Sequence, residues 1–303
     1  MAAVIGVLCA RMRVEEKQVL QALAEAGVPA RLLPPADAPV PIAPVPTKPA
    51  TAGDQDTRVV VDRCQNRTAA AAILPLRRAS CGTVLDAGLA ATGTRADVAA
   101  ALAAAGVPRP TTMLVTSEAA GLAATETAGY PATYLPLTPG SQEIALLDRD
   151  TAEAVFEHRS TLGGPSAVLG IVQAGATFER GRVSLVVVDG RAVGICDPAG
   201  RARYAARFAG VAELAAHALG AAIVGVDLIA GPEGPVVWDV NPVPEFRDAT
   251  PLGRLSVAEA IAELAAAHVV HKASIVTQLP LDGEVGLKLD LVREVPDGVV
   301  LSA

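Results

Sequence analysis

Short apolar runs alternate with amphipathic segments along the first part of the chain. Ala2–Leu8 has the pattern of a buried strand, the apolar spacing over Val14–Ala26 predicts a helix that ends at Gly27, and Val28–Leu33 is again strand-like. This β-α-β order is typical of a doubly wound α/β domain. The same alternation predicts a strand at Arg58–Asp62, a helix at Thr68–Ser80 and a strand at Thr83–Asp86.

After a helix expected at Thr94–Gly106, short strands are mixed with amphipathic helices. The strands are expected at Met113–Thr116, Ala132–Leu137 and Ile144–Leu147, and the helices at Ser117–Ala128 and Asp150–His158. Beyond Ala167, apolar runs separated by tight turns predict an antiparallel sheet. Its strands are expected at Ala167–Gln173, Arg182–Asp189, Ala192–Cys196, Val224–Ile229 and Val236–Val240, and its helices at Val211–Leu219 and Ser256–His268.

These changes of pattern divide the chain into three parts. We expect an N-terminal α/β domain over residues 1–90, a central α+β lobe over 91–166, and a C-terminal α+β lobe over 167–303. The last segment, Ser274–Ala303, is expected to form extra strands, and the alternation in Leu287–Val292 favours an edge strand or a subunit contact. This apolar tail predicts a homo-oligomer, either a dimer or a tetramer.

Three oxygen-bearing side chains interrupt an otherwise apolar hairpin. Asp227 lies in its first strand, and Asp239 and Asn241 lie in its second. Residues two apart share a strand face, so Asp239 and Asn241 point the same way, and Asp227 lies beside them if the hairpin closes. Such a set suits Mg²⁺, which prefers oxygen ligands. The alternative is that these residues only cap turns.

A polar segment, Arg63–Arg67, follows the strand expected at Arg58–Asp62. Ligands of open α/β sheets collect at the carboxyl ends of the parallel strands, so this segment is a candidate binding loop. The alternative is that its side chains cap the next helix.

Composition excludes several classes of protein. A chain of 303 residues with 51% hydrophobic residues is long enough for a large core, and a net charge of −7 argues against nucleic-acid and anionic-membrane partners. No apolar run is long enough to span a bilayer, and no basic region precedes the apolar Met1–Cys9 segment. The four cysteines are scattered without a Cys-x-x-Cys pair, which favours reduced thiols and a cytoplasmic protein.

The hairpin also carries a resemblance to a known family. Gly225-Val-Asp-Leu-Ile229 followed by Asp239-Val-Asn-Pro242 resembles the end of the ATP-grasp fold, and in particular the amino-acid ligases of the RimK and LysX type. Ala105–Thr111 is similar to that family's entry into the central domain. Phe156–Gly164 and the Arg63-Cys64 pair are also similar to segments of these ligases, so the resemblance extends over most of the chain.

The resemblance implies an ATP-dependent ligase in which a carboxylate becomes an acyl phosphate and an amine then displaces the phosphate. It assigns Mg²⁺ to Asp227, Asp239 and Asn241, and catalytic charge stabilisation to Arg95 and Arg207. The residues implied for ATP are Arg95, Gly140, Ser141 and Gln173. The amino acid expected is glutamate, and the expected partner is a carboxylate-bearing small molecule, a pterin cofactor such as tetrahydromethanopterin, or a carrier protein.

The chain departs from the family pattern where the nucleotide is bound. Arg95 stands where the family has a lysine, and Leu135 replaces a second lysine. Gln142-Glu143 replaces the glycine of the lid, and Ser184 replaces an arginine. Arg207 and its neighbours Arg201 and Arg203 can compensate, or they can form a solvated basic loop.

These departures leave a second hypothesis open. Under this hypothesis the chain is a degenerate ATP-grasp protein with weak or no ATP binding that acts as a binding or partner subunit. The retained acidic set favours the ligase, and the lost lysine, glycine and arginine favour the degenerate protein.

Overall fold

The computed structural model describes residues 4–35, 57–138, 141–175, 181–196 and 205–277. Its N-terminal domain is a parallel sheet in the order β2-β1-β3-β4, which confirms the doubly wound pattern. The elements are β1 (Val4–Leu8), α1 (Val14–Glu25), β2 (Ala30–Leu33), β3 (Thr57–Asp62), α2 (Arg67–Cys81) and β4 (Thr83–Leu85).

Two helices, α3 (Leu89–Thr92) and α4 (Arg95–Ala104), lead into the central lobe. Its antiparallel sheet has the order β5-β8-β6-β7, and α5 and α6 pack against it. The elements are β5 (Thr112–Val115), α5 (Glu118–Ala128), β6 (Ala132–Pro136), β7 (Ile144–Leu146), α6 (Arg149–Leu162), the 3₁₀ helix η1 (Pro165–Val168) and β8 (Gly170–Ala174). Strand β8 thus belongs to the central sheet, although the sequence pattern places residues 167–173 in the C-terminal lobe. Pairing between strands, and not their order in the chain, decides this assignment.

The C-terminal lobe is an antiparallel sheet in the order β12-β11-β9-β10-β13. Its elements are β9 (Val183–Val188), β10 (Arg191–Cys196), α8 (Ala205–Leu219), β11 (Ile223–Ala230), β12 (Pro235–Asn241), β13 (Thr250–Pro251) and α9 (Val257–Thr277). Helix α8 begins at Ala205, so the end of the segment expected as a basic loop, including Arg207, is helical.

Helix α9 corrects the expectation for the tail. Strands were expected from Ser274, but residues 274–277 continue α9, because no glycine or proline interrupts the Ala-rich sequence before Pro280. The rest of the expected strands, including Leu287–Val292, lies outside the described residues. Neither α9 nor any other helix within the described ranges is long and apolar enough to cross a membrane.

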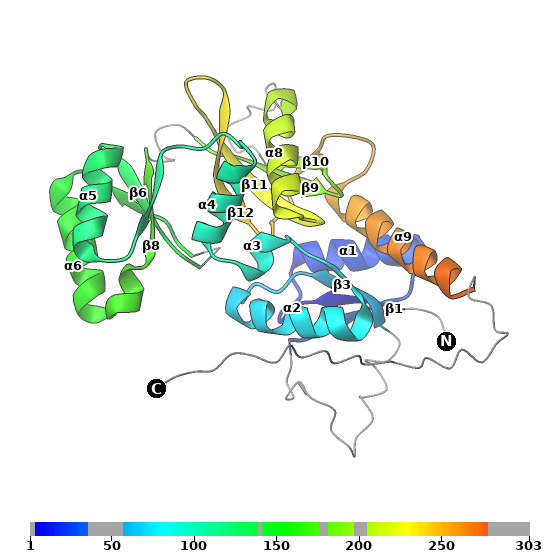
Figure 1. Ribbon diagram of the computed structural model, residues 1–303. Helices are drawn as coiled ribbons and strands as arrows, with labels where there is room; N and C mark the ends of the chain where they lie inside the picture. The colour runs from blue at the N-terminus through cyan, green and yellow to red at the C-terminus, as the bar shows by residue number, and fades with distance from the viewer. Residues whose placement is uncertain (1–3, 36–56, 139–140, 176–180, 197–204, 278–303) are drawn as a thin grey trace, which may run out of the picture.

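The N-terminal domain and the C-terminal lobe pack as one unit. Strand β9 places Val183, Leu185 and Val187 in a core shared with α2, α4 and α8, and its alternate residues Val186 and Val188 in a core shared with α1 and α9. The central lobe has a core of its own, in which Tyr134 and Phe156 meet edge to face at 5.4 Å. Figure 1 shows this lobe, in green, standing to one side of the rest. Apolar packing therefore divides the molecule into two bodies.

Gly88 lies where the N-terminal domain packs closely against the C-terminal lobe. Gly88 has φ of +58°, and a Cβ built there would lie 2.0 Å from the carbonyl oxygen of Leu219 at the end of α8. Close by, the carbonyl of Asp86 accepts hydrogen bonds from the backbone N–H groups of Ala222 and Ile223 at 2.8 and 3.1 Å. A side chain at position 88 would separate the N-terminal domain from the C-terminal lobe.

We therefore expect Gly88→Ala to destabilise the protein. The left-handed backbone adds roughly 1–2 kcal/mol, and the steric overlap adds roughly 1–3 kcal/mol. Gly106→Ala is the matched control, because Gly106 has φ of +68° but nothing within 4 Å of its Cβ position. Urea unfolding measures both variants. Equal losses of stability in the two would show that the approach to α8 does not matter.

Candidate functional site

The hairpin of β11 and β12 brings the predicted acidic residues to one face. Asp227 pairs with Asp239 across the two strands, and Gly225 pairs with Asn241. Paired residues point to the same side of a sheet, and so do residues two apart in a strand. Asp227, Asp239 and Asn241 therefore share one face, as the spacing in the sequence predicts.

Asp227 is a largely buried carboxylate whose pKa is raised. It accepts a hydrogen bond from the Ser184 hydroxyl and lies 3.5 Å from the Arg182 guanidinium. Its side chain is 17% exposed. Burial raises the pKa of Asp227 to about 6, and the charge of Arg182 and the Ser184 hydrogen bond lower this pKa only in part. The neighbouring Asp239 carboxylate raises it further.

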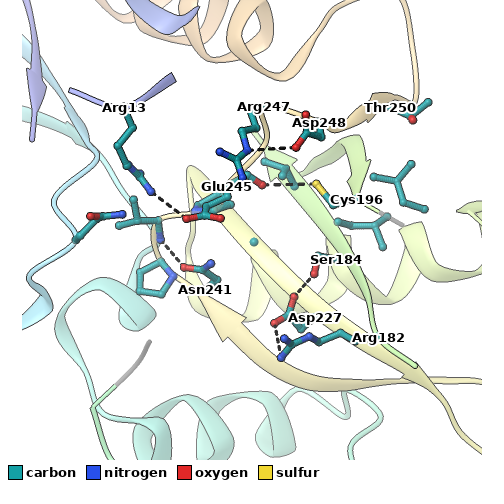
Figure 2. Close-up of a pocket in the computed structure, with 18 of the residues that line it drawn as sticks. Arg13, Arg182, Ser184, Cys196, Asp227, Asn241, Glu245, Arg247, Asp248 and Thr250 are labelled. Atoms are coloured by element: carbon teal, nitrogen blue, oxygen red, sulfur yellow. Dashed lines mark hydrogen bonds and ion pairs between the residues drawn. The ribbon is translucent and has the colours of Figure 1, made fainter. Parts of the chain in front are cut away.

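Asp227 and Asn241 line a cavity of about 780 Å³. Its walls come from the C-terminal sheet and from the N-terminal domain, which contributes Arg13, Gln65 and Arg67. Figure 2 shows Asp227 between Ser184 and Arg182 in one part of the cavity and Asn241 near Arg13 and Glu245 in another. The cavity that Asp227 and Asn241 line therefore lies against the N-terminal domain.

The charged groups around this cavity are paired. Arg13 lies 3.4 Å from Glu245 and 2.9 Å from Glu16, and Arg247 lies 3.2 Å from Asp248. The Nη2 of Arg67 donates to Asp62 at 2.9 Å, while its buried Nε has no partner among the described residues. The cavity therefore presents mixed charge to a ligand.

The segment Arg63–Arg67 contains a helix cap and residues of the cavity wall. Asn66 caps α2, with its Oδ1 accepting from the backbone N–H of Ala69 at 3.0 Å, while Gln65 and Arg67 line the cavity. Arg63 is 1% exposed and contacts Glu16 at 3.0 Å, the Pro244 carbonyl at 2.9 Å and the Phe246 ring. Arg63 thus joins the two domains behind the cavity.

Asp239 faces a different partner. The Nε and Nη2 of Arg95 form a fork on its carboxylate, and the shortest distance is 2.7 Å. The same guanidinium donates to the carbonyls of Pro136 at 2.8 Å, Thr138 at 3.0 Å and Ser141 at 2.9 Å. All the N–H donors of Arg95 are therefore engaged within the protein.

Gln173 is also engaged. Its side chain is fully buried in β8, accepts from Arg109 at 3.0 Å and from the Thr112 hydroxyl at 3.3 Å, and donates to the carbonyl of Trp238 at 3.0 Å. Trp238 is also fully buried, and its indole N–H donates to Glu143 at 2.8 Å. Gln173 and Glu143 thus connect the central lobe to β12.

Leu135 lies on the side of β6 that faces this connection. Its neighbour Tyr134 packs in the central-lobe core, so Leu135 points to the opposite face, beside Ile171 of β8. Leu135 and Ile171 are 1% and 2% exposed. Leu135 and Ile171 therefore occupy part of the boundary between the central lobe and the C-terminal sheet in this conformation.

The remaining predicted residues lie apart. Arg207 is exposed on α8 and lines a separate cavity of about 470 Å³ beside the β11–β12 turn. Ser141 lines a cavity of about 640 Å³ in the central lobe, and Gly140 lies outside the described residues. The structure does not bring Arg207 to Asp227.

Three arginines and a glutamate of this region escaped the sequence analysis. Arg13 follows the carboxyl end of β1, which is a signal that the sheet rule supplies. Arg182 and Arg109 have no such signal, because their partners Asp227 and Gln173 come from distant parts of the chain. Glu143 was noted only as a departure from the lid pattern.

The oxygen atoms of Asp227, Asp239 and Asn241 are of the kind that a hard cation prefers, but the three side chains are not arranged around one position. No group of three or more His, Cys, Asp or Glu side chains able to hold a metal occurs within the described ranges. Asp227 and the Asn241 amide offer oxygen atoms near the cavity, while the carboxylate of Asp239 is neutralised by Arg95. A cation held by all three residues requires Arg95 to leave.

Comparison with known proteins agrees with this architecture. Residues 5–84 match the family model of the LysX preATP-grasp domain. A RimK domain protein with an ATP-grasp fold from Sphaerobacter thermophilus is similar at 29% sequence identity, with a TM-score of 0.69 over 87% of this chain and 100% of that chain.

More distant solved structures share the fold. The ATP-grasp ligase PsnB, complexed with precursor peptide PsnA2 and AMPPNP, matches at 17% identity with a TM-score of 0.59, over 88% of this chain and 97% of that chain. D-alanine–D-alanine ligase from Bacillus anthracis, complexed with ATP, matches at 12% identity with a TM-score of 0.61, over 91% and 99%. Together with the acidic β11–β12 hairpin, these matches show that the chain has the ATP-grasp fold, and they support a protein of the RimK/LysX type.

Proposed function

We propose that the protein is an ATP-dependent carboxylate–amine ligase that joins an amino acid, with glutamate as the expected one, to a carboxylate-bearing small molecule or carrier protein. The observation that carries the proposal is the placement of Asp227 and Asn241 in a cavity of about 780 Å³. A cavity of this size holds a small ligand. We further propose that the protein acts in the cytoplasm as a homo-oligomer.

The walls of the cavity support a substrate with both charged and polar groups. Arg13 and Arg247 lie on its rim together with Glu245 and Asp248, so a ligand meets donors and acceptors at once. PsnB and the macrocyclase MdnC are both bound to precursor peptides in their solved structures. A carboxyl-bearing peptide or carrier segment is therefore a substrate class to test beside free small molecules.

The residues of the hairpin have separate tasks in this proposal. Asp227 and Asn241 would hold Mg²⁺, which neutralises phosphate charge when Mg·ATP is bound. Ser184 and Arg182 orient the Asp227 carboxylate. Asp239 is available to the cation only when Arg95 has moved away.

A second function is favoured by one specific observation. Arg95 occupies Asp239, and Leu135 and Trp238 are buried between the lobes, as expected of a degenerate ATP-grasp protein that binds no nucleotide and serves as a partner subunit. Nucleotide binding separates the two functions.

Calorimetry with Mg·ATP, followed by an assay for ADP released in the presence of glutamate and candidate carboxylates, tests the ligase. We expect Mg²⁺-dependent binding by the wild type. Asp227→Asn should weaken it roughly tenfold or more, because an ionic contact worth roughly 1.5–3 kcal/mol is lost.

Glu126→Gln is the matched control for this loss. Glu126 lies on α5, away from the residues that line the cavity, and its half-exposed side chain pairs with Arg149 at 3.0 Å. Its substitution should leave nucleotide affinity unchanged. Absence of Mg·ATP binding by the wild type would support the partner-subunit function instead.

The pKa of Asp227 predicts a dependence of stability on pH. The folded-state pKa of about 6 lies above the ordinary value of 3.8, so the folded protein holds this proton more tightly than the unfolded chain does. That contribution to stability is complete below pH 3.8 and is lost as pH rises through 6. In metal-free buffer Asp227→Asn should therefore be more stable than the wild type at pH 8, by up to about 3 kcal/mol, with the difference closing toward pH 4.

Urea unfolding in the presence of EDTA measures this difference, and added Mg²⁺ should stabilise the wild type at pH 8 but not at pH 4. A difference between the variants that does not change with pH would contradict the assigned titration.

A further inference from the structure

We propose that Arg95 is an autoinhibitory latch: its guanidinium binds Asp239 and the backbone at the end of β6, and so holds the central lobe closed against the C-terminal sheet until the ion pair opens. Only the consequence of the latch for nucleotide binding rests on the proposed function.

Arg95 is anchored in the larger of the two packed bodies. It is the first residue of α4, which the capping box of Thr94 and Asp97 fixes. Val98 and Leu102 of the same helix lie in the core shared by the N-terminal domain and the C-terminal lobe. The guanidinium therefore projects from a rigid support, and its side chain is 4% exposed.

From this support Arg95 reaches the second body. Its Nη1 donates to the carbonyls of Pro136 and Thr138, its Nη2 donates to Ser141, and its backbone N–H donates to Leu137 at 2.7 Å. These residues lie at the end of β6 and before β7, in the lobe whose apolar core is separate. One side chain thus ties the central lobe to Asp239 of the C-terminal sheet.

Several other contacts between the lobes are also polar. Gln173 donates to the Trp238 carbonyl, the Trp238 indole donates to Glu143, and Arg182 lies 3.7 Å from Glu143. Polar contacts between two separately packed bodies can open without disturbing either core. Among these contacts the Arg95 fork is the bidentate, charge-assisted one, which is the strongest kind.

The closed ion pair blocks the group expected to bind a cation and the group expected to bind phosphate at the same time. While the pair is closed, the Asp239 carboxylate is neutralised and cannot serve a cation, and Arg95 has no donor left for a phosphate. Opening a single ion pair would free the carboxylate and the guanidinium together. The apparent affinity for Mg·ATP is then reduced by the fraction of molecules that are open.

The chain carries its own reporter of this opening. Trp238 is the sole tryptophan, is fully buried between the lobes, and hydrogen-bonds to Glu143 of the central lobe. In the full chain without nucleotide, Arg95→Ala should shift tryptophan emission to the red and raise the acrylamide quenching constant several-fold. Arg149→Ala is the matched control, because Arg149 makes exposed ion pairs with Glu126 and Glu153 away from this contact, and it should change neither value.

Asp239→Asn opens the latch from the other side. It removes the charge but keeps the size of the side chain, so it decides the question if Arg95→Ala does not fold. Circular dichroism shows whether each variant is folded. Folded variants in which Trp238 stays shielded would overturn the latch.

Calorimetry with Mg·ATP on Arg95→Lys keeps the two proposals apart. Lysine retains the charge but cannot form the fork, so its tryptophan should be partly exposed, and Mg·ATP should bind more tightly than to the wild type if the protein is a ligase. Exposed tryptophan without nucleotide binding supports the latch and contradicts the ligase. Shielded tryptophan with nucleotide binding supports the ligase and overturns the latch.

Discussion

Asp227 and Asp239 face each other across β11 and β12, in a sheet whose other positions are largely apolar. Like charges at directly opposed positions destabilise a strand pair, and buried charges need partners. The chain neutralises them separately, with Arg182 and Ser184 on Asp227 and with Arg95 on Asp239. The arrangement of the whole site follows from this division, because one carboxylate stays with the cavity and the other is used between the lobes.

The separate apolar core of the central lobe explains why the contact of Asp239 between the lobes matters. The N-terminal domain and the C-terminal lobe share their apolar packing, whereas the central lobe is packed by itself around Tyr134 and Phe156. Polar groups such as Arg95 and Gln173, together with the buried side chains of Leu135 and Ile171, therefore hold the central lobe beside the C-terminal sheet. A site at the boundary of two bodies can be complete in one position and hidden in another.

Several parts of the site follow from local pattern. The period of two places Asp239 and Asn241 on one face, and the tight turn brings Asp227 opposite. The segment Arg63–Arg67 follows a parallel strand, and its residues reach the cavity as the sheet rule predicts. The tail was predicted wrongly at Ser274, because short-range alternation competes with a helix that nothing terminates.

Local sequence pattern predicts the fold, the superfamily resemblance and the shared face of Asp227, Asp239 and Asn241, because strand period, turn chemistry and motif spacing act between near neighbours. It did not determine what these residues contact. Arg95 meets Asp239 across 144 positions, and Gln173 meets Trp238 across 65. The folded chain shows that the arginine expected to bind phosphate is engaged with the carboxylate expected to bind a metal. Charge–charge contact depends on distance in space, and a sequence pattern does not contain that distance.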